Sequence, residues 1–236
     1  MIKRFFSGFL CIILIAVFIL AAEFKTKTGG ISVSTAMSKE STKIVIIDAG
    51  HGGFDGGAVA FDGTVEKDLN LQIALKFEAI LKLYGYETVM VRTEDVAVND
   101  PSDSGVSAKA SDIKNLVAIM EKYPQAIFVS IHMNKYQTTQ PHGAQVFYAK
   151  SDKSDFLAEC IQNSVATFVQ TDNKRVIKPT TKDIYLLYHA TVPSVIAECG
   201  FLSNQNDLNN LKTPDYQLKI AFSIANGIID YYKQEV

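Results

Sequence analysis

Residues 43–236 alternate between two patterns of apolar positions. Short segments rich in apolar and β-branched residues predict buried strands at residues 43–47, 87–91, 126–131, 144–149 and 194–197. Between them, apolar residues recur at helical spacing and predict helices over residues 66–84, 112–123 and 154–169, and a last one opening at residues 213–214. This alternation indicates an α/β fold: a three-layer domain with a mostly parallel central sheet covered by helices on both faces.

Residues 5–22 form a longer apolar run that follows Lys3 and Arg4. A run of about 17–25 apolar residues is long enough to cross a membrane as a helix, and cations before it favour the cytoplasmic side. The alternative is a cleaved signal peptide, which has an apolar core of about 7–15 residues and a small-residue cleavage site. We predict that residues 1–24 are a transmembrane anchor or a signal sequence. Either one directs the rest of the chain out of the cytoplasm, anchored to the bacterial membrane or secreted.

The remaining sequence is read as a tether and one domain. Residues 25–41 are small and polar, as in a flexible tether, and residues 42–236 have the length of a single domain. The formal net charge is −2 and the sequence has no basic block, so we expect no nucleic-acid partner. Cys160 and Cys199 are the cysteines of this domain; one disulfide between them is an option, whereas a disulfide framework is excluded. Cys199 is more simply a packed thiol than a nucleophile.

Several side chains suited to metal chemistry are predicted to meet at one edge of the sheet. His51 and His132 each follow a predicted strand, and Glu66 opens the first predicted helix of this domain. In parallel α/β folds, ligands bind beyond the carboxyl ends of the strands. A catalytic Zn²⁺ usually has three protein ligands and an open fourth position. We therefore predict one Zn²⁺ per chain, held by His51, Glu66 and His132.

Glu198, which follows another predicted strand, is the candidate catalytic residue. Hydrolysis of an amide needs a base that takes a proton from water and passes it to the leaving amine, and a nearby cation would keep this carboxylate ionised. Each candidate also has an ordinary explanation: Glu66 is favourable at a helix start, His51 fits a glycine loop without a metal, His132 fits a strand end with its hydrogen bonds satisfied, and Glu198 fits a salt bridge. Their convergence at one sheet edge favours a site.

Three further residues are candidates for contacts with substrate or with the ligands. Asp48 precedes the glycine-rich segment around His51 and is suited to orient a ligand histidine. Asn134 follows His132 closely and either bonds substrate or braces its loop, while His189 lies between Tyr188 and Ala190 and is a candidate for a place near substrate. We expect His142 and Arg92 to be structural.

Four motifs follow one another along the chain: DAGHGGFD at residues 48–55, VEKD at 65–68, FVSIHMN at 128–134 and VIAECGFLSN at 195–204. In this order they resemble the motifs of the zinc-dependent N-acetylmuramoyl-L-alanine amidases of the third amidase class. The resemblance extends over residues 43–232. It implies that His51, Glu66 and His132 bind zinc, that Glu198 is catalytic, and that the chain cuts the amide bond between N-acetylmuramoyl residues and L-alanine in bacterial peptidoglycan. Ala49, Lys135 and Cys199 depart from the common pattern without removing a ligand or the base.

The chain is most similar in layout to amidases of the sporulation type. The single N-terminal apolar run and the segment at residues 184–188 carry this narrower resemblance. It implies a role in spore cortex, where removal of stem peptides allows muramic-δ-lactam to form before germination. The alternatives are a vegetative cell-wall amidase in cell separation, a non-catalytic peptidoglycan-binding module on the same fold, and a zinc peptidase that cuts within the stem peptide. Expected partners are peptidoglycan, the membrane through the N-terminal helix, and an accessory or activating protein.

Overall fold

The predicted strands and long helices are all present in a computed structural model that describes residues 43–99 and 107–234. The strands are β1 (Ile44–Ala49), β2 (Glu87–Met90), β3 (Ile127–Asn134), β4 (Gln145–Tyr148), β5 (Lys178–Pro179) and β6 (Ser194–Phe201). The helices are α2 (Glu66–Leu83), α3 (Ala108–Lys122), α4 (Ser154–Phe168), α5 (Tyr185–Tyr188), α6 (Gln205–Leu211) and α7 (Pro214–Gln234). The short elements β5, α5 and α6 were not predicted from the sequence.

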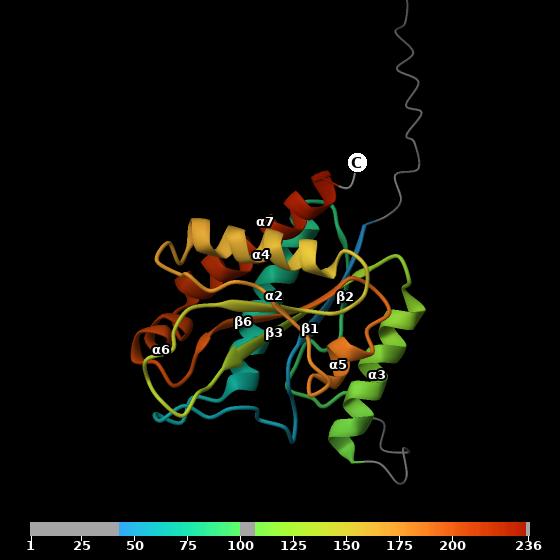
Figure 1. Ribbon diagram of the computed structural model, residues 1–236. Coiled ribbons are helices and arrows are strands. Elements are labelled where there is room, and N and C mark those ends of the chain that lie inside the picture. Colours follow the sequence, from blue (N-terminus) through green and yellow to red (C-terminus); the bar gives the residue numbers. More distant parts are fainter. Residues whose placement is uncertain (1–42, 100–106, 235–236) are drawn as a thin grey trace, which may run out of the picture. The chain divides into compact units, whose positions relative to one another are not determined.

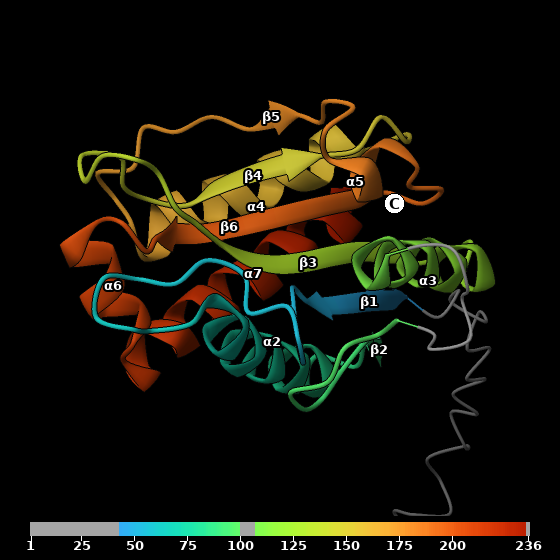
Figure 2. The same ribbon diagram turned by 90° about the horizontal axis from the view of Figure 1, so that it is seen from below.

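The strands form one six-stranded sheet in the order β2-β1-β3-β6-β4-β5 (Figure 2). β2, β1, β3 and β6 are parallel, whereas β4 pairs antiparallel with β6 and parallel with β5. Parallel neighbours need a long crossover, usually a helix, between them. The chain from β3 to β4 contains no helix, and β4 runs back in the opposite direction. The sheet is therefore mostly parallel, as predicted, and its antiparallel step lies between β6 and β4.

Helices cover both faces of this sheet (Figure 1). On one face, Val45, Ile47 and Ala49 of β1 pack in a core with side chains of α2, α4 and α7. On the other face, Ile44 and Ile46 pack against residues of α3 and α5. Successive side chains of a strand point to opposite faces, so each face receives alternate residues of β1.

The same alternation brings polar side chains onto the α3–α5 face. Asp48 pairs in register with Ser130 of β3, and His132 of β3 pairs in register with Glu198 of β6. Both His132 and Glu198 lie inside their strands rather than after them. The sequence underestimated these strands because the apolar run ends before the strand does. The polar end of the sheet is therefore rigid strand rather than loop.

Helix α2 has the ends that its sequence predicts. Leu69, Ile73, Phe77 and Leu81 form its buried stripe, with exposed fractions of 4% or less. After the helix, Gly85 has φ +82°, a left-handed conformation that glycine adopts without strain and that commonly ends helices. Because α2 begins at Glu66, the position of this helix on the sheet also fixes one of the candidate metal ligands.

Two predictions of a different kind concern the cysteines and the N-terminal segment. Cys160 and Cys199 are both free, so the optional disulfide is not formed. Cys199 is buried, and burial raises the pKa of its thiol, as expected of a packed and unreactive side chain. No helix within residues 43–99 and 107–234 is long and apolar enough to span a membrane. The predicted anchor or signal sequence at residues 1–24 and the tether at 25–41 lie outside the described residues.

Candidate metal centre and active site

His51 stands on a sharp turn directly after β1. Its φ is +63°, in the left-handed region that few residues other than glycine adopt. The turn also needs Gly50, because a Cβ at that position would lie 2.1 Å from Nε2 of His132. Such a conformation persists only where its surroundings enforce it, and it clusters at functional sites. Here it brings the imidazole of His51 to the end of the sheet, beside His132.

The carboxylate of Glu66 is held by backbone groups from two other segments. Its Oε2 accepts a hydrogen bond from the Ala58 N–H at 2.8 Å, and its Oε1 accepts one from the Met133 N–H at 3.0 Å. The residue is 3% exposed. A buried carboxylate is costly unless it is bonded or paired, so these bonds both stabilise Glu66 and aim Oε1 at the histidines.

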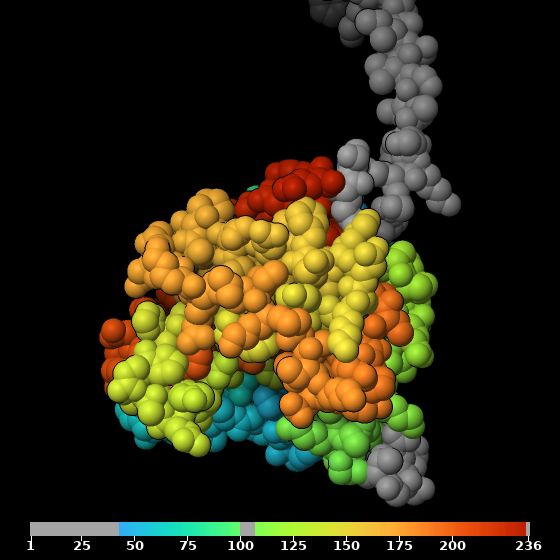
Figure 3. All heavy atoms as spheres, viewed as in Figure 1, coloured from blue at the N-terminus to red at the C-terminus, as the bar shows by residue number. Residues whose placement is uncertain are grey.

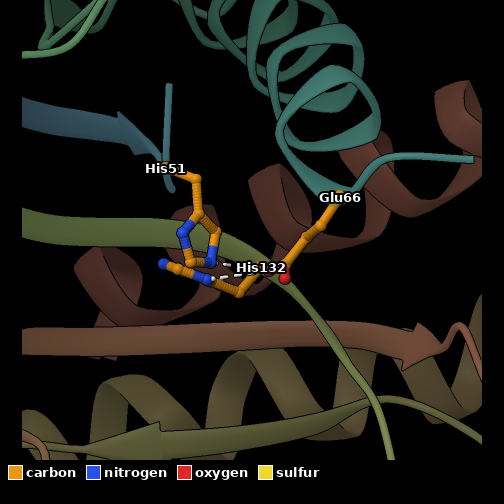
Figure 4. Close-up of side chains that lie close together, drawn as sticks. All are labelled: His51, Glu66 and His132. Carbon is orange, nitrogen blue, oxygen red and sulfur yellow. Dashed lines mark hydrogen bonds and ion pairs between the residues drawn. The ribbon is translucent and has the colours of Figure 1, made fainter. Parts of the chain in front are cut away.

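The structure brings the three candidate zinc ligands together (Figure 4). Glu66 Oε1 lies 3.0 Å from Nδ1 of His132 and 3.3 Å from Nε2 of His51. One ligand atom from each residue lies within 4.8 Å of the other two. The two imidazole rings meet edge to face, with centroids 4.9 Å apart. Two nitrogens and one carboxylate oxygen are the donor set of many catalytic zinc sites.

The charges of these groups depend on one another. Burial alone would lower the pKa of His132, but the hydrogen bond to Glu66 together with the nearby charges of Glu198, Glu66 and Asp48 raises it to about 9. Burial also acts to lower the pKa of His51, whereas the hydrogen bond to Glu66 acts to raise it, and the resulting pKa is raised. In Glu66, burial favours the neutral acid, yet the hydrogen bonds to His132 and His51 hold its pKa well below the usual range. The pocket thus favours positive charge facing Glu66.

Glu198 lies beside this cluster on β6. Glu198 is the register partner of His132. Its side-chain Oε2 is buried without a hydrogen-bond partner among the described residues. Burial raises the pKa of Glu198 to about 7, against a lowering effect of His132. An unpaired buried carboxylate oxygen is expensive to maintain. This oxygen is therefore available to a substrate, a water or a cation.

A cleft of about 260 Å³ opens next to the two histidines on the α3–α5 face. Its apolar wall includes Ile113 and Leu116 of α3, Leu186 of α5 and Ile196 of β6. Figure 3 shows the corresponding surface, where blue atoms from the loop after β1 are bordered by green atoms of α3 and orange atoms around α5. A concave, mostly apolar site with a few converging polar groups is the usual form of a ligand pocket.

The other candidates from the sequence occupy different places. Asp48 lines the cleft, but its carboxylate accepts a 2.6 Å hydrogen bond from the Ser130 hydroxyl. Asn134 ends β3, where its carbonyl accepts from the Leu202 N–H. His189 follows α5 with its ring centroid 4.0 Å from that of Tyr185, and it is Tyr185 that lines the cleft.

Asp55 and Arg92 both contact the segment around His51. Asp55, which closes the DAGHGGFD motif, lies 3.0 Å from Nδ1 of His51. Its only sequence signal is a carboxylate four residues after the histidine. Arg92 is structural, as predicted: its buried guanidinium donates to the carbonyls of Ala49, Gly50 and Lys67 and so fixes the His51 turn.

Comparison with known proteins agrees with this geometry. A family model described as N-acetylmuramoyl-L-alanine amidase matches residues 45–230. The germination-specific N-acetylmuramoyl-L-alanine amidase of Bacillus subtilis strain 168 is 33% identical over 206 residues, which cover 83% of this chain and 82% of that protein. The amidase LytC of the same strain is 30% identical over 194 residues, or 80% of this chain and 35% of LytC.

Solved structures show the same relationship. The CwlD amidase from Clostridioides difficile, in complex with the GerS lipoprotein, has a TM-score of 0.77 and 38% identity, covering 81% of this chain and 99% of that one. The catalytic domain of the amidase CwlV from Bacillus (Paenibacillus) polymyxa var. colistinus has a TM-score of 0.65 and 30% identity, covering 81% and 98%. The chain belongs to the N-acetylmuramoyl-L-alanine amidase family, and its similarity extends to a germination-specific member of that family.

Proposed function

We propose that this protein is a zinc-dependent amidase that hydrolyses the bond between N-acetylmuramoyl residues and L-alanine in bacterial peptidoglycan. The observation that carries the proposal is the convergence of His51, Glu66 and His132 within 4.8 Å, next to the unpaired carboxylate oxygen of Glu198. Membership of the amidase family supports the choice of substrate.

The residues present fit a zinc ion. Imidazole nitrogens and a carboxylate oxygen suit Zn²⁺, and Glu66 Oε1 already faces one nitrogen of each histidine. The negative carboxylate between two basic rings also shows a pocket that favours positive charge. When bound, Zn²⁺ polarises the substrate carbonyl and makes a water molecule more acidic.

The protein groups then account for the proton transfers. Water adds to the lactyl carbonyl carbon, and the Glu198 carboxylate takes its proton. The same carboxyl group returns the proton to the amide nitrogen as the C–N bond breaks, and a stem peptide headed by L-alanine leaves. Burial raises the pKa of Glu198 to about 7 when no cation is bound, and a bound Zn²⁺ would lower it and favour the ionised base.

The cleft wall gives this substrate a place to bind. Leu116, Leu186 and Ile196 offer an apolar surface beside the histidines, suited to the methyl groups of the lactyl and alanyl units on either side of the scissile bond. Water is thereby excluded from one side of the reacting amide, which strengthens the electrostatic effects of the site.

The narrower proposal is a role in maturation of spore cortex, where loss of stem peptides allows muramic-δ-lactam to form. The names of two relatives, the germination-specific amidase and CwlD, support it. The CwlD structure contains the GerS lipoprotein, which supports an accessory protein for this chain too. We further propose that the enzyme acts outside the cytoplasm and is anchored by residues 1–24. Cortex from spores without the gene should then lack muramic-δ-lactam, and a normal content would contradict the cortex role.

Product analysis tests the chemistry. The full-length protein should release intact stem peptides with a free L-alanine amino terminus from peptidoglycan, as read by mass spectrometry. Chelation of zinc should abolish release, and Glu198→Gln should lower kcat by about 10²–10⁴-fold, the usual contribution of a general acid–base group. Glu121→Gln, an exposed residue of α3, is the matched control and should behave as wild type. Activity that survives both chelation and Glu198→Gln contradicts the mechanism, and shortened stem peptides would indicate a peptidase.

A further inference from the structure

The two ring nitrogens of His51 face two different carboxylates. Nε2 lies 3.3 Å from Oε1 of Glu66, on the side where the candidate ligands meet. Nδ1 lies 3.0 Å from Oδ2 of Asp55, on the opposite side of the ring. A neutral imidazole carries its proton on one nitrogen and its lone pair on the other, and the partner of one nitrogen decides which is which. Asp55 is therefore placed to decide the tautomer of His51.

Asp55 is itself fixed in position by its own segment. Its Oδ1 accepts a 3.0 Å hydrogen bond from the Gly57 N–H. Its backbone pairs with that of Gly52 through hydrogen bonds of 2.9 Å and 3.1 Å. The carboxylate therefore does not need His51 to hold it in place, and it acts as a fixed point against which the imidazole is oriented.

We propose that Asp55 is a positioning residue for the metal centre: it keeps the proton of His51 on Nδ1, so that the lone pair of Nε2 points at the zinc position. This inference rests on the zinc chemistry proposed above. Ligand histidines generally donate their second N–H to a carboxylate or carbonyl, which fixes the ring and increases the basicity of the ligand. Such a partner matters more at His51, because its left-handed backbone conformation is strained. Without a hydrogen-bond partner the imidazole ring would occupy several rotamers.

Lys109 extends this chain of contacts to α3. Its Nζ lies 3.2 Å from Oδ2 of Asp55, and its side chain is 64% exposed. Exposed ion pairs contribute little, so Lys109→Gln should weaken zinc binding much less than any change at Asp55. The lysine and the histidine face the same oxygen, Oδ2 of Asp55.

The competing explanation is that Asp55 only braces its turn through Gly57. Asp62 provides a matched control for that explanation. It belongs to the same loop, accepts a 3.0 Å hydrogen bond from the Thr64 N–H and pairs with Lys212 at 2.6 Å. Like the carboxylate of Asp55, it accepts from a backbone N–H two residues later and pairs with a lysine, but these two partners do not include a histidine.

Zinc affinity of the full-length protein, measured by competition with a coloured chelator, tests the inference. Asp55→Ala should weaken zinc binding by about 10- to 100-fold, the usual effect of removing such a partner. Asp55→Asn should also weaken zinc binding, because its one amide oxygen, kept on the Gly57 N–H, leaves the NH2 group as a donor facing Nδ1 of His51. Asp62→Ala should bind zinc as wild type does. At saturating zinc, Asp55→Ala should recover most of its kcat with an unchanged KM.

The outcomes separate this inference from the function on which it rests. If both Asp55 variants are folded by circular dichroism and bind zinc as tightly as wild type, the positioning role is wrong while the amidase assignment stands. An equal loss in Asp62→Ala would show loop bracing instead and would also overturn the role. Should Asp55→Ala fail to fold, Asp55→Asn still decides the question. Absence of zinc binding by the wild-type protein would overturn both proposals.

Discussion

Close approach of side chains in the metal centre depends on glycine at the positions beside them. A Cβ on Gly57 would lie 2.6 Å from Cδ2 of His51 and 2.7 Å from Oε2 of Glu66. Gly57 also has φ +69°, where other residues are strained. The residue therefore has two separable roles: it makes a turn that other residues resist, and it leaves room for two candidate ligands.

Gly57→Ala should therefore weaken zinc binding as well as stability. The strain of a left-handed alanine costs about 1–2 kcal/mol, and the added methyl group must also displace His51 or Glu66. Gly63→Ala is the matched control, because Gly63 has φ +88° but no atom within 4 Å of an added Cβ. The melting temperature should fall for both variants, whereas the affinity for zinc should fall for Gly57→Ala alone. Equal zinc affinities in the two variants would contradict the steric role.

Which elements the sequence could reveal depended on length and periodicity. Helix α2 was predictable because a long buried stripe, from Leu69 to Leu81, repeats at helical spacing. Helix α5, with four residues, and strand β5, with two, are too short to carry a period. The reversed direction of β4 was also hidden, because pairing between strands is a long-range property that a local pattern does not contain.

The residues of the candidate site also fall into those that the sequence predicted and one that it did not. His51, Glu66, His132 and Glu198 were found because each lies at or near the end of a predicted element, and parallel strands bring such ends together. Asp55 was missed because it belongs to an irregular turn whose course follows from the left-handed His51. The sequence motif contains two aspartates, and only the folded turn shows that the later one, Asp55, lies beside Nδ1 of His51.

At the level of elements, α4 and α7 pack closely on the sheet face opposite the cleft. The contact needs Gly227 of α7, where a Cβ would lie 2.6 Å from Cα and 2.8 Å from N of Ile161. These are backbone atoms of α4, so the neighbour is unable to rotate away. Small residues at such positions allow the axes of two helices to lie closer together than usual.

Gly227→Ala should destabilise the domain even though alanine is the better helix former. The gain in helix propensity is about 1 kcal/mol, whereas overpacking against fixed atoms costs about 1–3 kcal/mol and requires the helices to separate. We expect a net loss in the free energy of unfolding, measured with urea, and unchanged zinc affinity. Lys219→Ala, on the exposed side of α7, should change stability by no more than about 0.5 kcal/mol. A Gly227→Ala variant more stable than wild type would contradict the close packing.

At the scale of the whole domain, the candidate metal ligands come from segments that are distant in the sequence. His51 follows β1, Glu66 begins α2 and His132 lies in β3. The three residues therefore link two strands of the sheet to a helix packed on it. The unfolded chain has no such preformed group of ligands, so zinc bound by the native state should stabilise the domain as a unit.

Zinc should therefore raise the melting temperature of the full-length protein in a concentration-dependent way. Binding to the native state alone contributes about 2.7 kcal/mol when free zinc is 100 times its dissociation constant. His132→Ala removes a candidate ligand and should abolish the shift. His142→Ala should retain it, because His142 is exposed and is not one of the three candidate ligands; its Nδ1 lies 3.1 Å from the Gln140 carbonyl. Differential scanning calorimetry with added zinc, and again with excess chelator, measures the effect. A shift of equal size in His132→Ala would mean that zinc stabilises the domain from some other place, and the three-residue centre would then have to be abandoned as the metal site.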